Sequence, residues 1–157
     1  MTNKTKNIQQ AEQSLRIIEE GMYQHGNDLV AVKDHIAKSV ELTFTASPAG
    51  LKELSEQKLS EAKYDTQIEV NHLSANEALA VKRPGVKTAV LNFASAKNPG
   101  GGFLGGAVAQ EESLARTSSL YASLTKEMTL YEFNRSNSTF LYSDYMIYSP
   151  QVVFWTD

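Results

Sequence analysis

A glycine-rich segment that directly follows an apolar stretch constrains the fold of this chain more than any other feature. Residues 100–106 contain five glycines in seven positions, and residues 87–94 before them are almost continuously apolar. A short, nearly continuous apolar run is typical of a central parallel strand that is buried on both faces. Because ligands bind beyond the carboxyl ends of such strands, the sequence predicts a ligand-binding loop over residues 95–109.

The composition of this loop favours a role in binding. Glycine lets the backbone bend sharply and lie close against a ligand, and consecutive amides ahead of a helix form a site for phosphate. Phe103 and Leu104 stand between the glycines, so we expect the loop to pack against the body of the protein or to cover a bound sugar. The alternative is a mobile surface loop, which rarely carries apolar residues between its glycines.

The loop also contains the pattern Gly-x-Gly-x-x-Gly at Gly100, Gly102 and Gly105. In dinucleotide-binding folds these glycines come immediately after a strand and open the next helix. Here five residues separate Ala94 from Gly100, and the next helix is expected only near Gln110. An NAD-dependent oxidoreductase is therefore the weakest of the functional hypotheses.

Two adjacent carboxylates, Glu111 and Glu112, follow the loop at the expected helix start, and they have three interpretations. In the first, the two carboxylates only stabilise the helix through its dipole, by about 0.3–1 kcal/mol for each carboxylate. In the second, they form a glycosidase pair on opposite sides of one bond. That arrangement fails, because neighbouring side chains on a helix diverge by about 100° and cannot flank one bond from opposite faces. In the third, one acid acts on the leaving group of a sugar and the other holds a sugar hydroxyl. A helix start lowers the pKa of a carboxyl, whereas a neighbouring carboxylate and a substrate phosphate raise it.

The remaining patterns alternate between helix and strand, which predicts an α/β sandwich. We expect a frayed N-terminus over residues 1–9 and a single domain over 10–157. The segment 32–40 fits a helical stripe or an extended piece, and 127–137 is ambiguous. A first helix is expected from Gln10, with Leu15, Ile18 and Met22 on one face and an ending offered by Gly21 with Gly26 and Asn27. The other predicted elements are a short strand at Leu29 and Val30, a loop over 43–50, a helix over 51–63, a strand over 66–73, a helix that a Ser74–Glu77 capping box opens and Pro84 ends, a helix over 111–124 and a bent strand over 146–155.

Composition excludes several classes of function. The net charge of −3, without a basic run, argues against a wide nucleic-acid surface. The chain has no cysteine, which excludes disulfides and thiolate nucleophiles, and its three histidines lie too far apart for metal-ligand spacing. We therefore expect neither a metal nor a cofactor. No apolar run is long enough for a membrane span or a signal segment, which predicts a cytoplasmic protein.

The segment from Leu91 to Glu112 resembles the signature of the microbial-type poly(ADP-ribose) glycohydrolases. That signature is a triple glycine, a short spacer and then Gln-Glu-Glu, and the spacer here has seven residues. The residues that follow, through Tyr121, resemble the family as well, and the 148–154 segment does so more loosely. The resemblance therefore covers most of the chain.

The resemblance implies a macrodomain-like, three-layer α/β/α sandwich with a mixed sheet. Such a domain would bind ADP-ribose and hydrolyse the ribose–ribose bond of poly(ADP-ribose). Glu112 would be the general acid/base and Glu111 would hold ribose hydroxyls. Gln110 would support the acid loop and belong to the substrate-binding residues. Asn92 would lie beside the distal ribose. The five glycines that would shape the loop against the diphosphate and the ribose are Gly100, Gly101, Gly102, Gly105 and Gly106.

The resemblance also implies a longer chain. Family members continue with further strands, a second diphosphate loop and an aromatic residue near the adenine, so we expect this chain to be the N-terminal portion of such a domain. An uncovered strand edge would then invite pairing with a second copy. The rival hypothesis is an ADP-ribose-binding module without hydrolysis, which would need the glycines but not the two acids. No DNA, RNA or membrane partner is expected.

Overall fold

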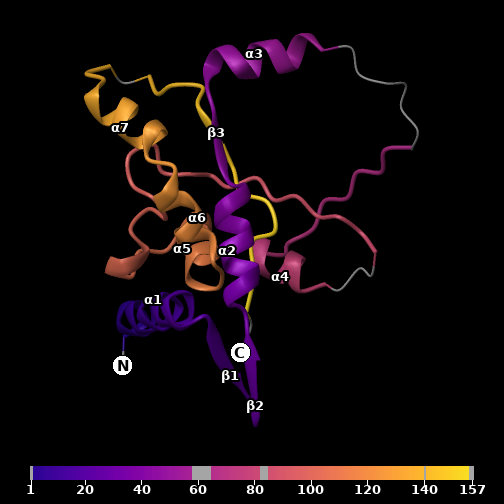
Figure 1. The fold of residues 1–157 in the computed structure, drawn as a ribbon, viewed down its shortest axis with the longest axis vertical. Coiled ribbons are helices and arrows are strands. Elements are labelled where there is room, and N and C mark those ends of the chain that lie inside the picture. The colour runs from indigo at the N-terminus through magenta and orange to yellow at the C-terminus, as the bar shows by residue number, and fades with distance from the viewer. Residues whose placement is uncertain (1, 58–64, 82–84, 140, 156–157) are drawn as a thin grey trace.

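The computed structural model describes residues 2–57, 65–81, 85–139 and 141–155. Helices and short strands succeed one another along the chain (Figure 1), which confirms the predicted α/β class. The elements are α1 (Asn3–Glu20), β1 (Met22–His25), β2 (Asp28–Ala31), α2 (Lys33–Leu42), β3 (Phe44–Ala46), α3 (Pro48–Glu56), α4 (Ala75–Ala80), the 3₁₀ helix η1 (Phe103–Gly105), α5 (Gln110–Arg116), α6 (Leu120–Lys126), α7 (Thr129–Ser136) and β4 (Met146–Tyr148).

Helix α1 begins at Asn3, so the prediction of a frayed segment over residues 1–9 is wrong for the described part of that segment. The Thr2 side chain caps the helix by accepting a hydrogen bond from the Thr5 amide. The first turns also have a tertiary partner, because Asn7 Nδ2 donates to the Gly106 carbonyl at 3.2 Å. This contact with the glycine loop orders a polar segment that has little apolar surface of its own.

The end of α1 lies at one of the positions predicted from the sequence, but Met22 does not belong to the helix. The helix ends at Glu20, and Gly21 follows it in the left-handed conformation. Met22 therefore belongs to β1 and does not share the helical face of Leu15 and Ile18. The short strand predicted at Leu29 and Val30 is confirmed as part of β2.

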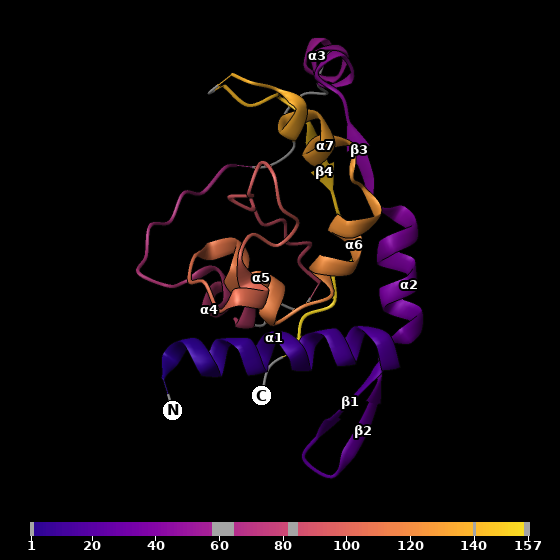
Figure 2. The same ribbon diagram turned by 90° about the vertical axis from the view of Figure 1, so that its left-hand side faces the viewer.

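The strands form two separate antiparallel pairs. The β1–β2 hairpin projects from the end of α1 (Figure 2), and β3 pairs with β4 with Phe44 opposite Tyr148. The bent strand predicted over 146–155 is thus a true strand only over β4, and an isolated bridge joins Phe154 to Ser118. No parallel pairing and no mixed sheet occur within the ranges that the structure describes.

The segments 66–73 and 87–94 are not paired as strands, which contradicts both predictions. Ile68 and Val70 are 88% and 92% exposed, and Leu91 is 76% exposed. An apolar pattern specifies a strand only where a neighbouring strand supplies hydrogen bonds and another layer covers its faces. None of the described strands lies beside either segment, so the pattern is present without the partners that would make it a sheet.

Several helix boundaries also differ from prediction. The segment 43–50 is not a loop, because it contains β3 and the start of α3, which the Ser47 side chain caps. Helix α3 ends at Glu56, and residues 58–63 of the predicted helix lie outside the described residues. The two ambiguous segments fold as α2 and α7. The capping box of Ser74 and Glu77 is confirmed at α4, whereas Pro84 lies outside the described residues.

The helix predicted over 111–124 is broken into α5 and α6 at Thr117–Ser119. The C-terminal segment docks into this break: the Ser119 amide donates to the Val153 carbonyl at 2.9 Å, and the Trp155 amide donates to the Thr117 carbonyl at 3.0 Å. Helical periodicity continues through the break in the sequence. The interruption therefore depends on a segment that is distant along the chain, which a local pattern does not encode.

The core consists of three clusters that the helices share. The first joins Ile17, Val32, Ile36 and Trp155. The second joins Ala11 of α1 to Phe103 of η1 and Ala115 of α5, and the third joins Leu114, Leu120 and Leu124. Helix α1 therefore runs along the base of α5 and the glycine loop (Figure 2). None of the helices in the described ranges is long and apolar enough to cross a membrane.

Candidate active site

The first turn of α5 carries Gln110, Glu111 and Glu112, and each of these side chains binds a different part of the preceding chain. The helix begins at Gln110, as predicted, and Ala109 before it supplies no side-chain cap. The three side chains accept hydrogen bonds from backbone amides between residues 93 and 102. This turn thus gathers the end of the apolar segment, the turn at Ser95 and the glycine loop around two carboxylates.

The glycine loop holds the Glu112 carboxylate. Glu112 Oε1 accepts a hydrogen bond from the Gly102 amide at 2.9 Å. A Cβ atom on Gly101 would overlap this oxygen and lie 2.9 Å from Glu112 Cδ. Gly101 also has a φ of +59°, which lies in the left-handed region that favours glycine. The absence of a side chain at Gly101 therefore leaves the space that the Glu112 carboxylate occupies.

The Glu111 carboxylate is buried, with 2% of the residue exposed. Its Oε2 accepts the Ser95 amide at 2.7 Å, and its Oε1 accepts Asn92 Nδ2 at 3.3 Å. Burial raises the pKa of Glu111 above its ordinary value, and the hydrogen bonds from Ser95 and Asn92 oppose part of that rise. The structure thus brings Asn92, which the resemblance places beside the distal ribose, against one of the two acids.

The raised pKa of Glu111 makes the stability of the fold depend on pH. The folded chain binds the Glu111 proton more tightly than the unfolded chain does. The stability from Glu111 is therefore fully present below the ordinary carboxyl pKa and is lost as the pH rises through the raised value. Glutamine cannot ionise, so we expect Glu111→Gln to gain melting temperature relative to the parent between about pH 4 and about pH 7.

Thermal melts of both proteins across this range measure the effect. The hydrogen bonds that the glutamine variant loses shift its melting temperature by an amount that does not change with pH. The decisive quantity is therefore how the difference in melting temperature between variant and parent changes with pH. The same substitution at the exposed Glu132, Glu132→Gln, is the control and should leave the trend of the parent unchanged. A difference between Glu111→Gln and the parent that stays constant with pH would contradict the expectation.

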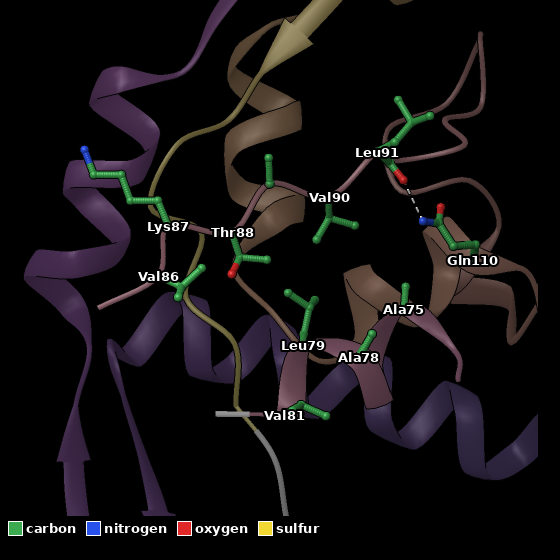
Figure 3. A pocket seen from close by; sticks show the side chains of 11 residues that line it. Ala75, Ala78, Leu79, Val81, Val86, Lys87, Thr88, Val90, Leu91 and Gln110 are labelled. Atoms are coloured by element: carbon green, nitrogen blue, oxygen red, sulfur yellow. Dashed lines mark hydrogen bonds between the residues drawn. The ribbon is translucent and has the colours of Figure 1, made fainter. Parts of the chain in front are cut away.

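The Gln110 carboxamide binds the end of the apolar segment. Its Nε2 donates to the Leu91 carbonyl at 2.8 Å, and its Oε1 accepts the Phe93 amide at 2.8 Å. Figure 3 shows this contact at the edge of a cavity of about 580 Å³, which lies between α4 and residues 86–91. The cavity is lined mainly by apolar side chains, among them Leu79 and Val90.

Several amides of the glycine loop donate hydrogen bonds within the protein. The loop folds into consecutive turns around η1, and its backbone presents the Gly102 amide to Glu112. The use of this loop as a phosphate cradle stays a prediction. The loop bonds are Gly101 N to Asn98 O at 3.0 Å, Phe103 N to Gly100 O at 3.3 Å, Gly105 N to Gly102 O at 3.0 Å, Gly106 N to Phe103 O at 3.1 Å and Ala107 N to Gly102 O at 3.2 Å.

The apolar residues of the loop have separate positions. Phe103 is 1% exposed and packs against Ala11 and Ala115, whereas Leu104 is 47% exposed. The loop is therefore packed into the body, as one of the sequence interpretations held. Gly106 allows close contact with α1, because a Cβ there would lie 2.7 Å from the Lys4 carbonyl oxygen. A Cβ on Gly105 would meet no atom within 4 Å, so the structure gives no steric reason for glycine at that position.

Sequence reasoning missed the contribution of α7. The Asn134 side chain is buried, with 2% of the residue exposed. Its Nδ2 donates to the Ala96 carbonyl at 3.1 Å, and its Oδ1 accepts the Ser143 amide at 3.0 Å. These bonds connect the turn after Asn92 to the C-terminal half. Tyr131, one turn earlier, is 1% exposed, and burial with the nearby Glu111 charge raises the pKa of its hydroxyl. Neither residue belongs to a motif, and only their spacing on one helical face groups them.

Within the part of the chain that the structure describes, no group of three or more His, Cys, Asp or Glu side chains is arranged to hold a metal ion. The acids of the site are instead held by hydrogen bonds from Ser95, Asn92 and Gly102. The chemistry that this site offers is that of two carboxylates.

Comparison with known proteins agrees with the resemblance seen in the sequence. The family described as microbial-type PARG, catalytic domain, matches residues 11–157. The crystal structure of poly(ADP-ribose) glycohydrolase (PARG) from Thermomonospora curvata matches with a TM-score of 0.89 and 38% identity, over 98% of this chain and 57% of that chain. The same enzyme bound to the inhibitor ADP-HPD matches with a TM-score of 0.85 and 39% identity, over 98% and 56% of the two chains.

No curated protein matches the chain. The chain spans about 57% of the length of the first solved structure it matches. Because the family match extends over residues 11–157, and the structural match to a 38% identical glycohydrolase covers almost the whole chain, this protein belongs to the microbial-type poly(ADP-ribose) glycohydrolase catalytic domain family.

Proposed function

We propose that this protein hydrolyses the ribose–ribose O-glycosidic bonds of poly(ADP-ribose) and releases ADP-ribose, without a metal or a cofactor. The observation that carries the proposal is a pair of adjacent carboxylates that are each held by a separate backbone amide, Ser95 for Glu111 and Gly102 for Glu112. The solved relatives support it, because they are poly(ADP-ribose) glycohydrolases and one is bound to ADP-HPD.

Glu112 serves as the general acid/base. As a carboxylic acid it donates its proton to the oxygen of the leaving ribose while the bond from that oxygen to the anomeric carbon breaks. The resulting carboxylate then takes a proton from the water molecule that adds to the anomeric carbon, which restores the acid. The diphosphate of the substrate stabilises the positive charge of the oxocarbenium-like state. Glu111 cannot act from the opposite face, since consecutive helical residues diverge by about 100°.

Glu111 and Asn92 bind the ribose whose bond is cleaved. Ionised Glu111 accepts hydrogen bonds from ribose hydroxyls, and it is fixed for this task by the Ser95 amide. Asn92 Oδ1 is buried and has no hydrogen-bond partner among the described residues, so it supplies a further acceptor. The glycines Gly100, Gly101, Gly102, Gly105 and Gly106 shape the loop that carries the general acid.

Incubation of this chain with purified poly(ADP-ribose) tests the proposal. Release of free ADP-ribose, detected by chromatography, is the expected result. Calorimetric titration with ADP-ribose distinguishes the rival, because saturable binding without release would identify a binding module. Release from a protein that carries a single ADP-ribose, without release from polymer, would change the proposed substrate.

Three further expectations from the sequence remain proposals. The first is a three-layer macrodomain-like sandwich, which the structural match to a longer poly(ADP-ribose) glycohydrolase chain supports. The second is pairing of two copies through an exposed strand edge. The third is a cytoplasmic location without DNA, RNA or membrane partners, for which the lack of cysteine and of a basic run are the supporting observations.

A further inference from the structure

The Gln110 carboxamide binds the chain on both sides of Asn92. Nε2 donates to the carbonyl of Leu91 and Oε1 accepts the amide of Phe93, both at 2.8 Å. A residue of a parallel β-strand bonds its neighbour strand in the same way, to the carbonyl before and the amide after the residue it faces. A single side chain therefore supplies here the pair of hydrogen bonds that a strand would supply.

Nothing else in the described structure holds this part of the backbone by hydrogen bonds. Residues 91–93 belong to no strand, and their backbone makes no hydrogen bond to another described backbone group. Packing contributes little on the outer face, because Leu91 and Phe93 are 76% and 71% exposed. Figure 3 shows Gln110 reaching from the start of α5 to the Leu91 carbonyl. The conformation at Asn92 therefore depends on the Gln110 carboxamide.

The side chain of Asn92 connects this backbone to the acids. Asn92 Nδ2 donates to Glu111 Oε1 at 3.3 Å, while Asn92 Oδ1 is buried and without a hydrogen-bond partner among the described residues. A rotation of the backbone at 91–93 would move both ends of this carboxamide at once. It would remove a hydrogen bond from Glu111 and displace the buried Oδ1 acceptor, which has no partner among the described residues.

We propose that Gln110 is a positioning residue, which fixes the backbone around Asn92 and so aims the Asn92 carboxamide at Glu111 and at the bound ribose. This role refines the site of the proposed function and rests on that function for its catalytic consequence. Both polar atoms of Gln110 are engaged with the protein, so Gln110 acts through Asn92 and does not itself bind the substrate. This geometry therefore does not fit a direct role of Gln110 in substrate binding.

A double-mutant cycle on the full chain tests the proposal. We expect Gln110→Ala to lower kcat/KM for poly(ADP-ribose) by about tenfold, and to cause less than about a twofold further loss in the Asn92→Ala background, because residues that act through one another are not additive. Gln110→Met keeps the length and the helix propensity of the side chain without its amide and should lose as much as Gln110→Ala. Gln9→Ala, at an exposed position of α1, is the matched control. Equal losses from Gln110→Ala in both backgrounds would overturn the proposal.

A second measurement decides the proposal without any turnover. In nitrogen-edited NMR spectra, Gln110→Ala should shift the side-chain amide signals of Asn92 and speed hydrogen exchange of the Phe93 amide by about tenfold, since exchange follows local opening. Gln9→Ala should change neither signal. If the chain releases no ADP-ribose, the proposed function fails for this chain, and the spectra alone decide the role of Gln110. Unchanged Asn92 signals in Gln110→Ala would overturn that role whatever the activity.

Discussion

Replacement of Glu112 by glutamine is expected to abolish release of ADP-ribose from poly(ADP-ribose) while leaving the affinity for ADP-ribose nearly unchanged. Glutamine has the shape of glutamate, and its Oε1 still accepts the Gly102 amide that holds Glu112 at 2.9 Å. It cannot give a proton to the leaving oxygen or take one from water. General acid–base catalysis contributes about 10²–10⁴-fold to rate, so the loss of kcat should be of that size.

Two assays on the same preparation measure this effect: release of ADP-ribose gives kcat, and calorimetry gives the affinity for ADP-ribose. Glu132→Gln is the matched control, because Glu132 is an exposed acid in the first turn of α7. It should retain the turnover of the parent. Turnover that survives in Glu112→Gln would show that another group supplies the proton, and Glu111 would be the next residue to replace.

Gly101→Ala is expected to lower turnover by about 10²-fold, the loss that a misplacement of about 1 Å in a reacting group can cause. The added Cβ would occupy the place of Glu112 Oε1, so the carboxylate must move away from the Gly102 amide. Gly101 also has a φ of +59°, and a left-handed conformation costs an alanine about 1–2 kcal/mol. The variant should therefore lose activity and a smaller amount of stability, which kcat and thermal melts measure separately.

Substitutions at two other glycines separate the effect of the displaced Glu112 carboxylate from the effect of backbone strain. A Cβ on Gly50 of α3 would come no closer than 3.5 Å to Ser47 Oγ, and no positive φ applies there, so Gly50→Ala should keep its activity and lose no stability. Gly26 has a φ of +60° but open space around its Cβ position, so Gly26→Ala should lose stability and keep its activity. If Gly101→Ala proves no less active than Gly26→Ala, the space beside Glu112 has no catalytic role.

The grouping of the candidate site residues could be predicted from the sequence because these residues are close together in the chain. Asn92, Gln110 and the two glutamates lie within 21 consecutive residues, from 92 to 112, and a contiguous motif carries both the residue types and their spacing. The start of α5 at Gln110 could likewise be predicted from the sequence. The contact of Asn134 with Ala96 could not be predicted, because it depends on how α7 packs against a turn 38 residues away.

The sheet was predicted poorly for the opposite reason. The apolarity of 87–94 indicates that this segment prefers to be buried, but it does not indicate which other segment would pair with it or cover it. Pairing is a property of two segments, and among the described residues the backbone of 87–94 is hydrogen-bonded by a side chain, that of Gln110, where a strand was expected.

The position of Trp155 has a consequence for how the chain is made on the ribosome. Trp155 completes the cluster with Ile17 and Ile36, and its Nε1 donates to Ser14 Oγ across 141 residues of sequence. Helix α1 and the hairpin after it leave the ribosome exit tunnel long before Trp155 does. Their apolar faces therefore stay uncovered until Trp155 has emerged, and exposed apolar surface of this kind makes a partly synthesised chain prone to aggregation.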